Sequence, residues 1–274
     1  MNKLIAVIKN SRGITLVEIL VAGLMTFILA AAVMEFYVSQ HGQVLVQEQI
    51  SDMQQNGRAA MNEIAAQVRQ SGYGLPDSMN CILGYNSNPD SIVLVYSKGP
   101  GCDVTIEWQM PQPSAELRCD GHDLSCFNDN EWAYIFDPNT NTGEYFYITK
   151  VQMAPAHIQH NLAPLSKAYP KGSYVISIDR LKYYVDNSDA AHPKLMRQKN
   201  FGAAQVYAED VTDLQFTYTL SDGTTTSAPS ANAIVKSVQL TVNARTMRAD
   251  EKYVSNSGYR NRNLNTRVFV RNAS

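Results

Sequence analysis

The apolar stretch at residues 14–38 constrains the fold of this chain more than any other feature. It is long enough to cross a bilayer as a helix, which takes about 20 apolar residues. Lys3, Lys9 and Arg12 precede it without any acidic residue, so the segment in front is basic. Near its start the stretch carries a carboxylate, Glu18. A charge in a membrane helix costs about 2.5–3.5 kcal/mol at the bilayer centre and less near an end, so an acid here indicates a function.

The junction between the basic leader and the apolar stretch differs from that of an ordinary secretory signal. In a secretory signal the cleavage site follows the apolar core. Here Gly13 precedes the core, so cleavage after Gly13 would leave the apolar helix on the mature chain. It would also free an amine on Ile14, about one helical turn from the carboxylate of Glu18. These opposite charges could neutralise each other within one chain or between neighbouring chains.

The helical pattern continues past the apolar stretch. Between residues 46 and 68, apolar residues and one glycine recur at steps of four and three, which is typical of an amphipathic helix. No proline occurs from residue 14 to residue 70. We therefore expect one helix over residues 14–70, spanning roughly 85 Å. Its second half should lie on a globular domain, with Gly57 permitting close approach. Glycines and Pro76 after residue 70 should end it.

The remainder, from about residue 77, is expected to form β-strands. Short runs rich in β-branched and aromatic residues alternate there with turn formers. The pairs 131–136 with 144–151 and 173–185 with 194–198 flank such turns and predict hairpins. Several antiparallel strands with one long helix predict the α+β class, in which the helix packs on antiparallel β-sheets. The remaining expected strands are 91–96, 103–108, 214–220, 235–242 and 266–270.

The start of the helix carries a family resemblance. Residues 12–22 (RGITLVEILVA) closely resemble the class III signal of type IV prepilins and type II secretion pseudopilins. In that family a prepilin peptidase cuts after the glycine and N-methylates the new first residue. The resemblance implies cleavage between Gly13 and Ile14, methylation of Ile14, and a role for Glu18 in subunit assembly. The family usually has Phe or Met as its first residue, so Ile14 is a mild departure.

A plain signal anchor is the alternative interpretation of this segment. A basic leader followed by about 20 apolar residues also directs a single-pass membrane protein. The leader would then stay uncleaved, and Glu18 would snorkel or face a partner helix. That interpretation explains neither the position of Glu18 nor the amphipathic sequence that follows.

Two further regions resemble the PilW-type minor pilins. The first is residues 52–73, and the second comprises the C-terminal segments 238–245, 259–262 and 266–272. All three C-terminal segments are also similar to GspJ-like pseudopilins.

The resemblance implies a pilin fold made of four segments. They are a prepilin leader (1–13), a transmembrane or filament-core helix (14–38), an amphipathic helix (39–72) and a β-rich periplasmic or surface domain (73–274).

For function, the resemblance implies a minor pilin that primes assembly of a type IV pilus and sits at or near the tip. Such a protein waits in the bacterial inner membrane with its C-terminal domain in the periplasm. Its partners are prepilin peptidase, inner-membrane lipid, other minor pilins, the major pilin and a tip adhesin. Two alternatives stay open: a GspJ-like minor pseudopilin of type II secretion, and a membrane-anchored periplasmic binding domain that never polymerises.

Charge gives no sign of a nucleic-acid partner. The chain carries a net charge of −2. Its basic residues concentrate after Arg245, which we interpret as a solvated or partner-facing edge rather than a DNA-uptake surface.

All four cysteines, Cys81, Cys102, Cys119 and Cys126, lie in the β region. An even number in an exported domain favours disulfides. Three connectivities are possible, and proximity in the sequence favours Cys81–Cys102 with Cys119–Cys126. The spacing does not match a zinc site, so we expect no bound metal.

One loop has a weak resemblance to a calcium site. Asp137, Asn139 and Asn141 place oxygens at alternate positions, as at the start of a calcium loop. The match then fails, because the glycine comes one place late and the twelfth position is Ile148. A plain hairpin loop is the favoured interpretation.

No enzyme motif is present. The five histidines are scattered, and the sequence contains no GxSxG, phosphate loop or HExxH. We therefore expect neither catalytic residues nor a cofactor. His157 and His160 could share a helical face, although Pro155 makes a helix doubtful there.

Overall fold

The computed structural model describes residues 13–230, 233–250 and 252–271. Its described residues fall into two units, one up to Ile50 and one from Ser51 onward. Most of the leader (residues 1–12) and the end of the C-terminal motif (residue 272) lie outside the described residues. The elements are α1 (Leu16–Gln70), β1 (Ile82–Tyr85), β2 (Ser91–Ser97), β3 (Asp103–Thr105), β4 (Leu117–Arg118), β5 (Glu131–Asp137), β6 (Thr142–Ile148), β7 (Lys150–Gln152), β8 (His157–Gln159), β9 (Tyr174–Asp186), β10 (Lys194–Lys199), β11 (Gln205–Glu209), β12 (Val211–Leu220), β13 (Thr225–Thr226), β14 (Val235–Arg245), η1 (Ser255–Gly258) and β15 (Asn261–Phe269).

The expected long helix is confirmed as α1, which begins two residues later than predicted and ends at Gln70. After Gln70, Gly72 and Gly74 adopt positive φ values of 80° and 72°, and the chain turns away from the helix. From residue 51 onward one face of α1 is buried at helical spacing, by Met53, Gly57, Ala60, Ile64, Ala65 and Val68. The amphipathic pattern in the sequence therefore corresponds to a real packing face.

A four-stranded antiparallel sheet with the order β13-β12-β14-β15 receives this face of the helix. Alternate residues of β14, including Val238 and Leu240, are fully or almost fully buried, and Phe216 of β12 lies directly opposite Leu240. Ile64 joins them in one apolar cluster. The period of two along the strands and the period of 3.6 along the helix thus bury apolar side chains against each other.

Gly57 lets the helix approach this sheet closely. A Cβ atom at this position would lie 2.8 Å from Leu264 Cδ1 and 3.3 Å from Ala244 Cβ. The expected role of Gly57 in close approach is therefore confirmed.

We expect Gly57→Leu to lower the free energy of unfolding by about 1–3 kcal/mol, because the added side chain overpacks this contact. Ala59→Leu is the matched control, since it adds bulk to the exposed side of the same helical turn. It should change stability by less than about 0.5 kcal/mol. Urea denaturation of the full chain in detergent measures both, and equal effects of the two variants would contradict the close-approach role.

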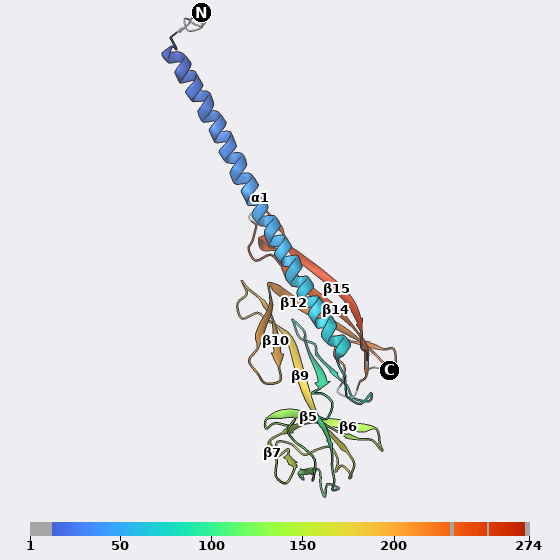
Figure 1. Cartoon of the computed structure of the whole chain (residues 1–274). Coiled ribbons are helices and arrows are strands. Elements are labelled where there is room, and N and C mark those ends of the chain that lie inside the picture. The colour runs from blue at the N-terminus through green and yellow to red at the C-terminus, as the bar shows by residue number, and fades with distance from the viewer. Residues whose placement is uncertain (1–12, 231–232, 251, 272–274) are drawn as a thin grey trace, which may run out of the picture. The chain divides into compact units, whose positions relative to one another are not determined.

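The second sheet is organised around the long strand β9. In its C-terminal part β9 pairs with β2 and β10, and in its N-terminal part with β3 and β5. Strand β9 therefore links the part of the sheet beside α1 to the part that carries the β5–β6 hairpin (Figure 1). A small sheet with the order β4-β8-β7 and a separate apolar core complete this distal part.

The α+β class is confirmed, and every strand pairing described is antiparallel. Both predicted hairpins form, β5 with β6 and β9 with β10. Two expected strands were too long: residues 103–108 contain only β3, and residues 144–151 break at Thr149 into β6 and β7. Strands β1, β4, β8, β11 and β13 were not expected, because segments of two to five residues give little periodicity.

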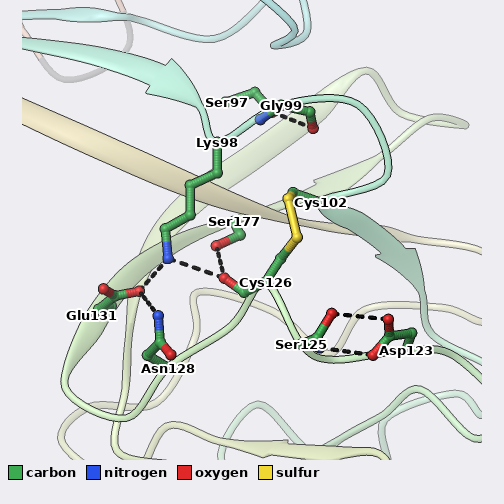
Figure 2. The surroundings of a disulfide bond; sticks show 10 residues. All are labelled: Ser97, Lys98, Gly99, Cys102, Asp123, Ser125, Cys126, Asn128, Glu131 and Ser177. Carbon is green, nitrogen blue, oxygen red and sulfur yellow. Dashed lines mark hydrogen bonds and ion pairs between the residues drawn. A yellow bond between two sulfur atoms is a disulfide. The ribbon is translucent and has the colours of Figure 1, made fainter.

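The predicted disulfide pairing was wrong. The structure joins Cys102 to Cys126 (Figure 2). Cys81 and Cys119 are free thiols. Ser177 of β9 binds both bridged residues: its amide donates to Cys102 O at 2.9 Å, and its hydroxyl donates to Cys126 O at 2.9 Å. Pairing with β9, rather than proximity in the sequence, brings the two cysteines together.

The free thiols are protected by their surroundings. Burial raises the pKa of Cys81 and of Cys119 to about 12. Because the thiolate is the reactive form, the raised pKa lowers the reactivity of both side chains in the folded protein.

Candidate functional site

The predicted processing site lies just before α1. Gly13, Ile14 and Thr15 are exposed and non-helical, and the helix begins at Leu16. Among the described residues other than its chain neighbour, no atom lies within 4 Å of a Cβ built on Gly13. The Gly13–Ile14 bond is therefore accessible without unwinding a helix.

Thr15 and Glu18 form a reciprocal cap at the start of α1. The Thr15 amide donates to Glu18 Oε2 at 2.9 Å, and the Glu18 amide donates to Thr15 Oγ1 at 3.3 Å. The Thr15 hydroxyl also donates to Glu18 Oε2 at 3.0 Å. This is a capping box, in which two helix-end donors are satisfied by side chains. Thr15 was not among the predicted site residues, although Ser or Thr three residues before an acid and ahead of an apolar run is a known sign of a capping box.

The cap places a negative charge at the positive end of the helix. Amide groups of the first turn give this end a partial positive charge. Cleavage before Ile14 would add an ammonium group within one residue of the cap. Glu18 is the acid of the first turn of α1. Its carboxylate is therefore placed to offset both the partial positive charge of the helix end and the charge of the ammonium group.

The side chains that follow are apolar and exposed. Ile14, Leu20, Phe27 and Phe36 are each more than 60 % exposed, and the segment is long and apolar enough to cross a membrane. A second acid, Glu35, also lies in this stretch and was not singled out from the sequence. At 1.5 Å per residue, Glu18 and Glu35 are about 25 Å apart along the helix, close to the hydrocarbon thickness of about 30 Å.

The loop with the weak calcium resemblance already has a cationic partner. Lys167 Nζ lies 3.0 Å from Asp137 Oδ2, and 3.0 Å from the hydroxyls of Thr140 and Thr142. Asp137 also accepts hydrogen bonds from the Asn139 amide and the Thr140 hydroxyl. The ammonium group thus binds Asp137, the one carboxylate among the three calcium candidates.

We expect added calcium to leave the melting temperature unchanged, and Lys167→Met to lower the free energy of unfolding by about 1–2 kcal/mol. Asp137 is only 3 % exposed, so its carboxylate would lose the cation that compensates its burial. Lys150→Met is the matched control, because its pair with Asp129 is more exposed and worth about 0–1 kcal/mol. A calcium-dependent rise in melting temperature that disappears in Asp137→Ala would support the calcium alternative instead.

The histidines do not gather into a catalytic or metal-binding group. His157 lies on strand β8, between Glu116 at 3.0 Å and Asp120 at 2.8 Å, so it shares no helical face with His160. His160 is buried, with Nε2 2.7 Å from the Ala115 carbonyl oxygen. Within the described residues, no group of three or more His, Cys, Asp or Glu side chains is arranged to hold a metal.

Several basic residues of the C-terminal region have structural partners. Arg245 donates to the carbonyl oxygens of Ala190 and Ala191 at 2.7 and 2.8 Å. Arg260 pairs with Asp250 at 2.8 Å. These contacts hold loops in place, so the expected basic edge is in part used within the chain.

Comparison with known proteins gives a structural likeness but no match in sequence. No protein-family model matches the chain, and no curated protein matches it significantly. Among solved structures it is similar to a type IV-like pilin from Thermus thermophilus, with 10 % sequence identity and a TM-score of 0.38. The match covers 84 % of this chain and 98 % of that one. At this identity and score the likeness assigns no role to the chain.

Proposed function

We propose that this chain is a minor pilin of a type IV pilus, made as a prepilin and assembled through its N-terminal helix. One observation carries the proposal: an accessible Gly13–Ile14 bond precedes a capped helix that exposes apolar side chains from its first turn onward. The resemblance of residues 12–22 to a prepilin signal adds to it.

The helix has two alternative apolar environments, in keeping with a protein that moves from membrane to filament. Residues 14–38 would lie in the inner membrane before assembly and in the filament core afterwards. Both environments cover the exposed side chains from Ile14 to Phe36 at low free-energy cost. Residues 39–72 would connect to the β-rich domain of residues 73–274 in the periplasm, where the Cys102–Cys126 bond is stable.

Within the filament, Glu18 would pair with the methylated amine of Ile14, either its own or that of a neighbouring subunit. To do so it exchanges the capping hydrogen bonds of Thr15 for an ion pair. The very tip of a filament can accommodate a subunit that lacks this acid. Because this chain retains Glu18, we place it near the tip of the filament rather than at the tip itself. There it would help to prime assembly with other minor pilins beneath an adhesin. Loss of the protein should then reduce piliation and twitching motility.

The test is the identity of the N-terminus in the native cell. Peptide mass spectrometry compares membrane and sheared-filament fractions. The proposal expects a peptide that begins with N-methylated Ile14 in both fractions.

An intact Met1 found in membranes alone would overturn the proposal in favour of a non-polymerising membrane-anchored domain. A second outcome combines a processed Ile14 in wild-type cells with normal piliation and impaired protein secretion in a strain that lacks the gene. This outcome would assign the chain to a type II secretion pseudopilus.

A further inference from the structure

The second sheet carries a small hollow that has no role in the proposed assembly. The residues that line it are distant in the sequence from the N-terminal segment. The hollow has a volume of about 200 Å³ and lies on the face of the sheet away from α1, at Val93. We call it the aromatic hollow; its walls are formed by Trp132, Arg180, Lys182, Gln198, Asn200 and Phe201.

Two cations of the aromatic hollow lack acidic partners. Arg180 and Lys182 alternate along β9 and so point to the same face of the sheet. Arg180 Cζ lies 4.8 Å above the ring of Trp132, and Lys182 Nζ lies 4.9 Å above the ring of Tyr184. Neither forms an ion pair with any carboxylate of the described residues.

The acids beside the hollow are already neutralised. Asp179 binds Lys199 Nζ at 2.8 Å and Asn200 Nδ2 at 2.9 Å. Glu131 is held by Lys98 and by Asn128 (Figure 2). The hollow therefore presents uncompensated positive charge, which is complementary to an anion.

A fixed aromatic wall stands next to these cations. Trp132 packs edge-on against Tyr147, and Tyr147 packs edge-on against Phe201, both with ring centroids 5.7 Å apart. Asn200 has a positive φ of 51°, and its side-chain oxygen accepts a hydrogen bond from the Arg180 amide at 2.8 Å. This turn at the end of β10 holds Phe201 outward, where 60 % of it is exposed.

The backbone hydrogen-bonding groups of the sheet are not available to a ligand at the aromatic hollow. Strands β2, β9 and β10 are each paired on both edges, so an extended peptide cannot add to them. Recognition must come from side chains alone: ring faces, two cations and the amide of Gln198. A ligand that uses all three has an apolar ring face, hydroxyl groups and a carboxylate.

We propose that the aromatic hollow binds an acidic polysaccharide, with one uronate ring against the exposed Phe201 and its carboxylate at Arg180 and Lys182, beside the Trp132 ring that Arg180 covers. The guanidinium group can bind the carboxylate through two parallel hydrogen bonds. Gln198 Nε2 already donates to Gly202 O at 2.9 Å, so its Oε1 is the atom that accepts from a ring hydroxyl. This binding is independent of processing and filament assembly.

Fluorescence of Trp132 gives a direct test. The chain has two tryptophans, so Trp108→Phe leaves Trp132 as the single reporter. The full chain in detergent micelles is titrated with hexagalacturonate, with maltohexaose of equal length as the uncharged comparison. We expect a saturable change in Trp132 fluorescence with hexagalacturonate only, weakened by added salt.

Variants localise the binding to this hollow. Arg180→Gln and Lys182→Gln should each weaken hexagalacturonate binding by about tenfold, the loss expected for one charge-assisted contact. Phe201→Ala should weaken it too, and its exposed position should leave folding intact. Lys236→Gln, which removes an exposed strand cation elsewhere, should leave the affinity unchanged.

Three results would overturn the proposal. They are no binding of hexagalacturonate, equal binding of maltohexaose, or tighter binding of hexaglutamate or of dodecathymidylate. The last two probes would reassign the hollow to an acidic peptide or to a single-stranded nucleic acid. Because the micellar chain is not assembled, each result stands whether or not the chain enters pili.

Discussion

Glu18→Ala should leave leader cleavage intact and reduce the amount of this protein in sheared filaments by about tenfold or more. The carboxylate is the proposed partner of the Ile14 amine, and leaving one member of a buried ion pair without its partner costs about 3–5 kcal/mol. Cleavage should persist because Gly13 and Ile14 lie before the helix and do not depend on the cap. Immunoblots of sheared and membrane fractions measure incorporation, and the mobility of the band reports cleavage.

Two matched variants separate charge pairing from the other roles of Glu18. Glu35→Ala removes a carboxylate from the same apolar stretch and should leave incorporation near the wild-type level. Thr15→Ala removes the reciprocal cap, worth about 0.5–2 kcal/mol, while retaining the carboxylate. If Thr15→Ala blocked incorporation as strongly as Glu18→Ala, helix capping would account for the effect and the ion-pair role would be wrong.

The Cys102→Ala/Cys126→Ala double variant should lose about 3 kcal/mol of unfolding free energy. The bond joins residues 24 positions apart, and a loop of this length constrains the unfolded chain by about that amount. The loss should appear as a lower urea midpoint for the β-rich unit of the full chain in detergent. Because the bond ties the segment after β2 to the segment before β5, its removal should loosen the distal part first.

Alkylation provides the control for that connectivity. When the wild-type protein is unfolded without reductant and treated with iodoacetamide, Cys81 and Cys119 should be the labelled residues. Reductant should then expose Cys102 and Cys126 to label as well. Labelling of Cys102 before reduction would contradict the bond.

The N-terminal segment was predictable because its signals are local. A basic leader, an apolar run and a carboxylate five residues after Gly13 are read directly from neighbouring positions. The helix period from Val46 to Val68 is equally local, and it correctly identified Gly57, Ile64 and Val68 as members of the packing face. Thr15 was missed although its capping signal is present in the sequence.

The distal β-region was predicted only in outline. Long strands such as β5, β9 and β14 carry enough alternation to be recognised, whereas β4 and β8 contain two and three residues and carry almost none. Gly143 shows the same limit: a Cβ there would overlap the Ile135 carbonyl oxygen, a constraint set by the partner strand.

The sequence by itself determined the long helix, its apolar and amphipathic halves and the α+β class, and it predicts the processing site, because periodicity and short motifs are properties of adjacent residues. Tertiary structure alone decided which cysteines pair and which cations remain without acids. Cys102 meets Cys126 because both bind Ser177, and Arg180 faces Trp132 because β5 and β9 pair. Such contacts join residues distant along the chain, and only the pairing of strands fixes them.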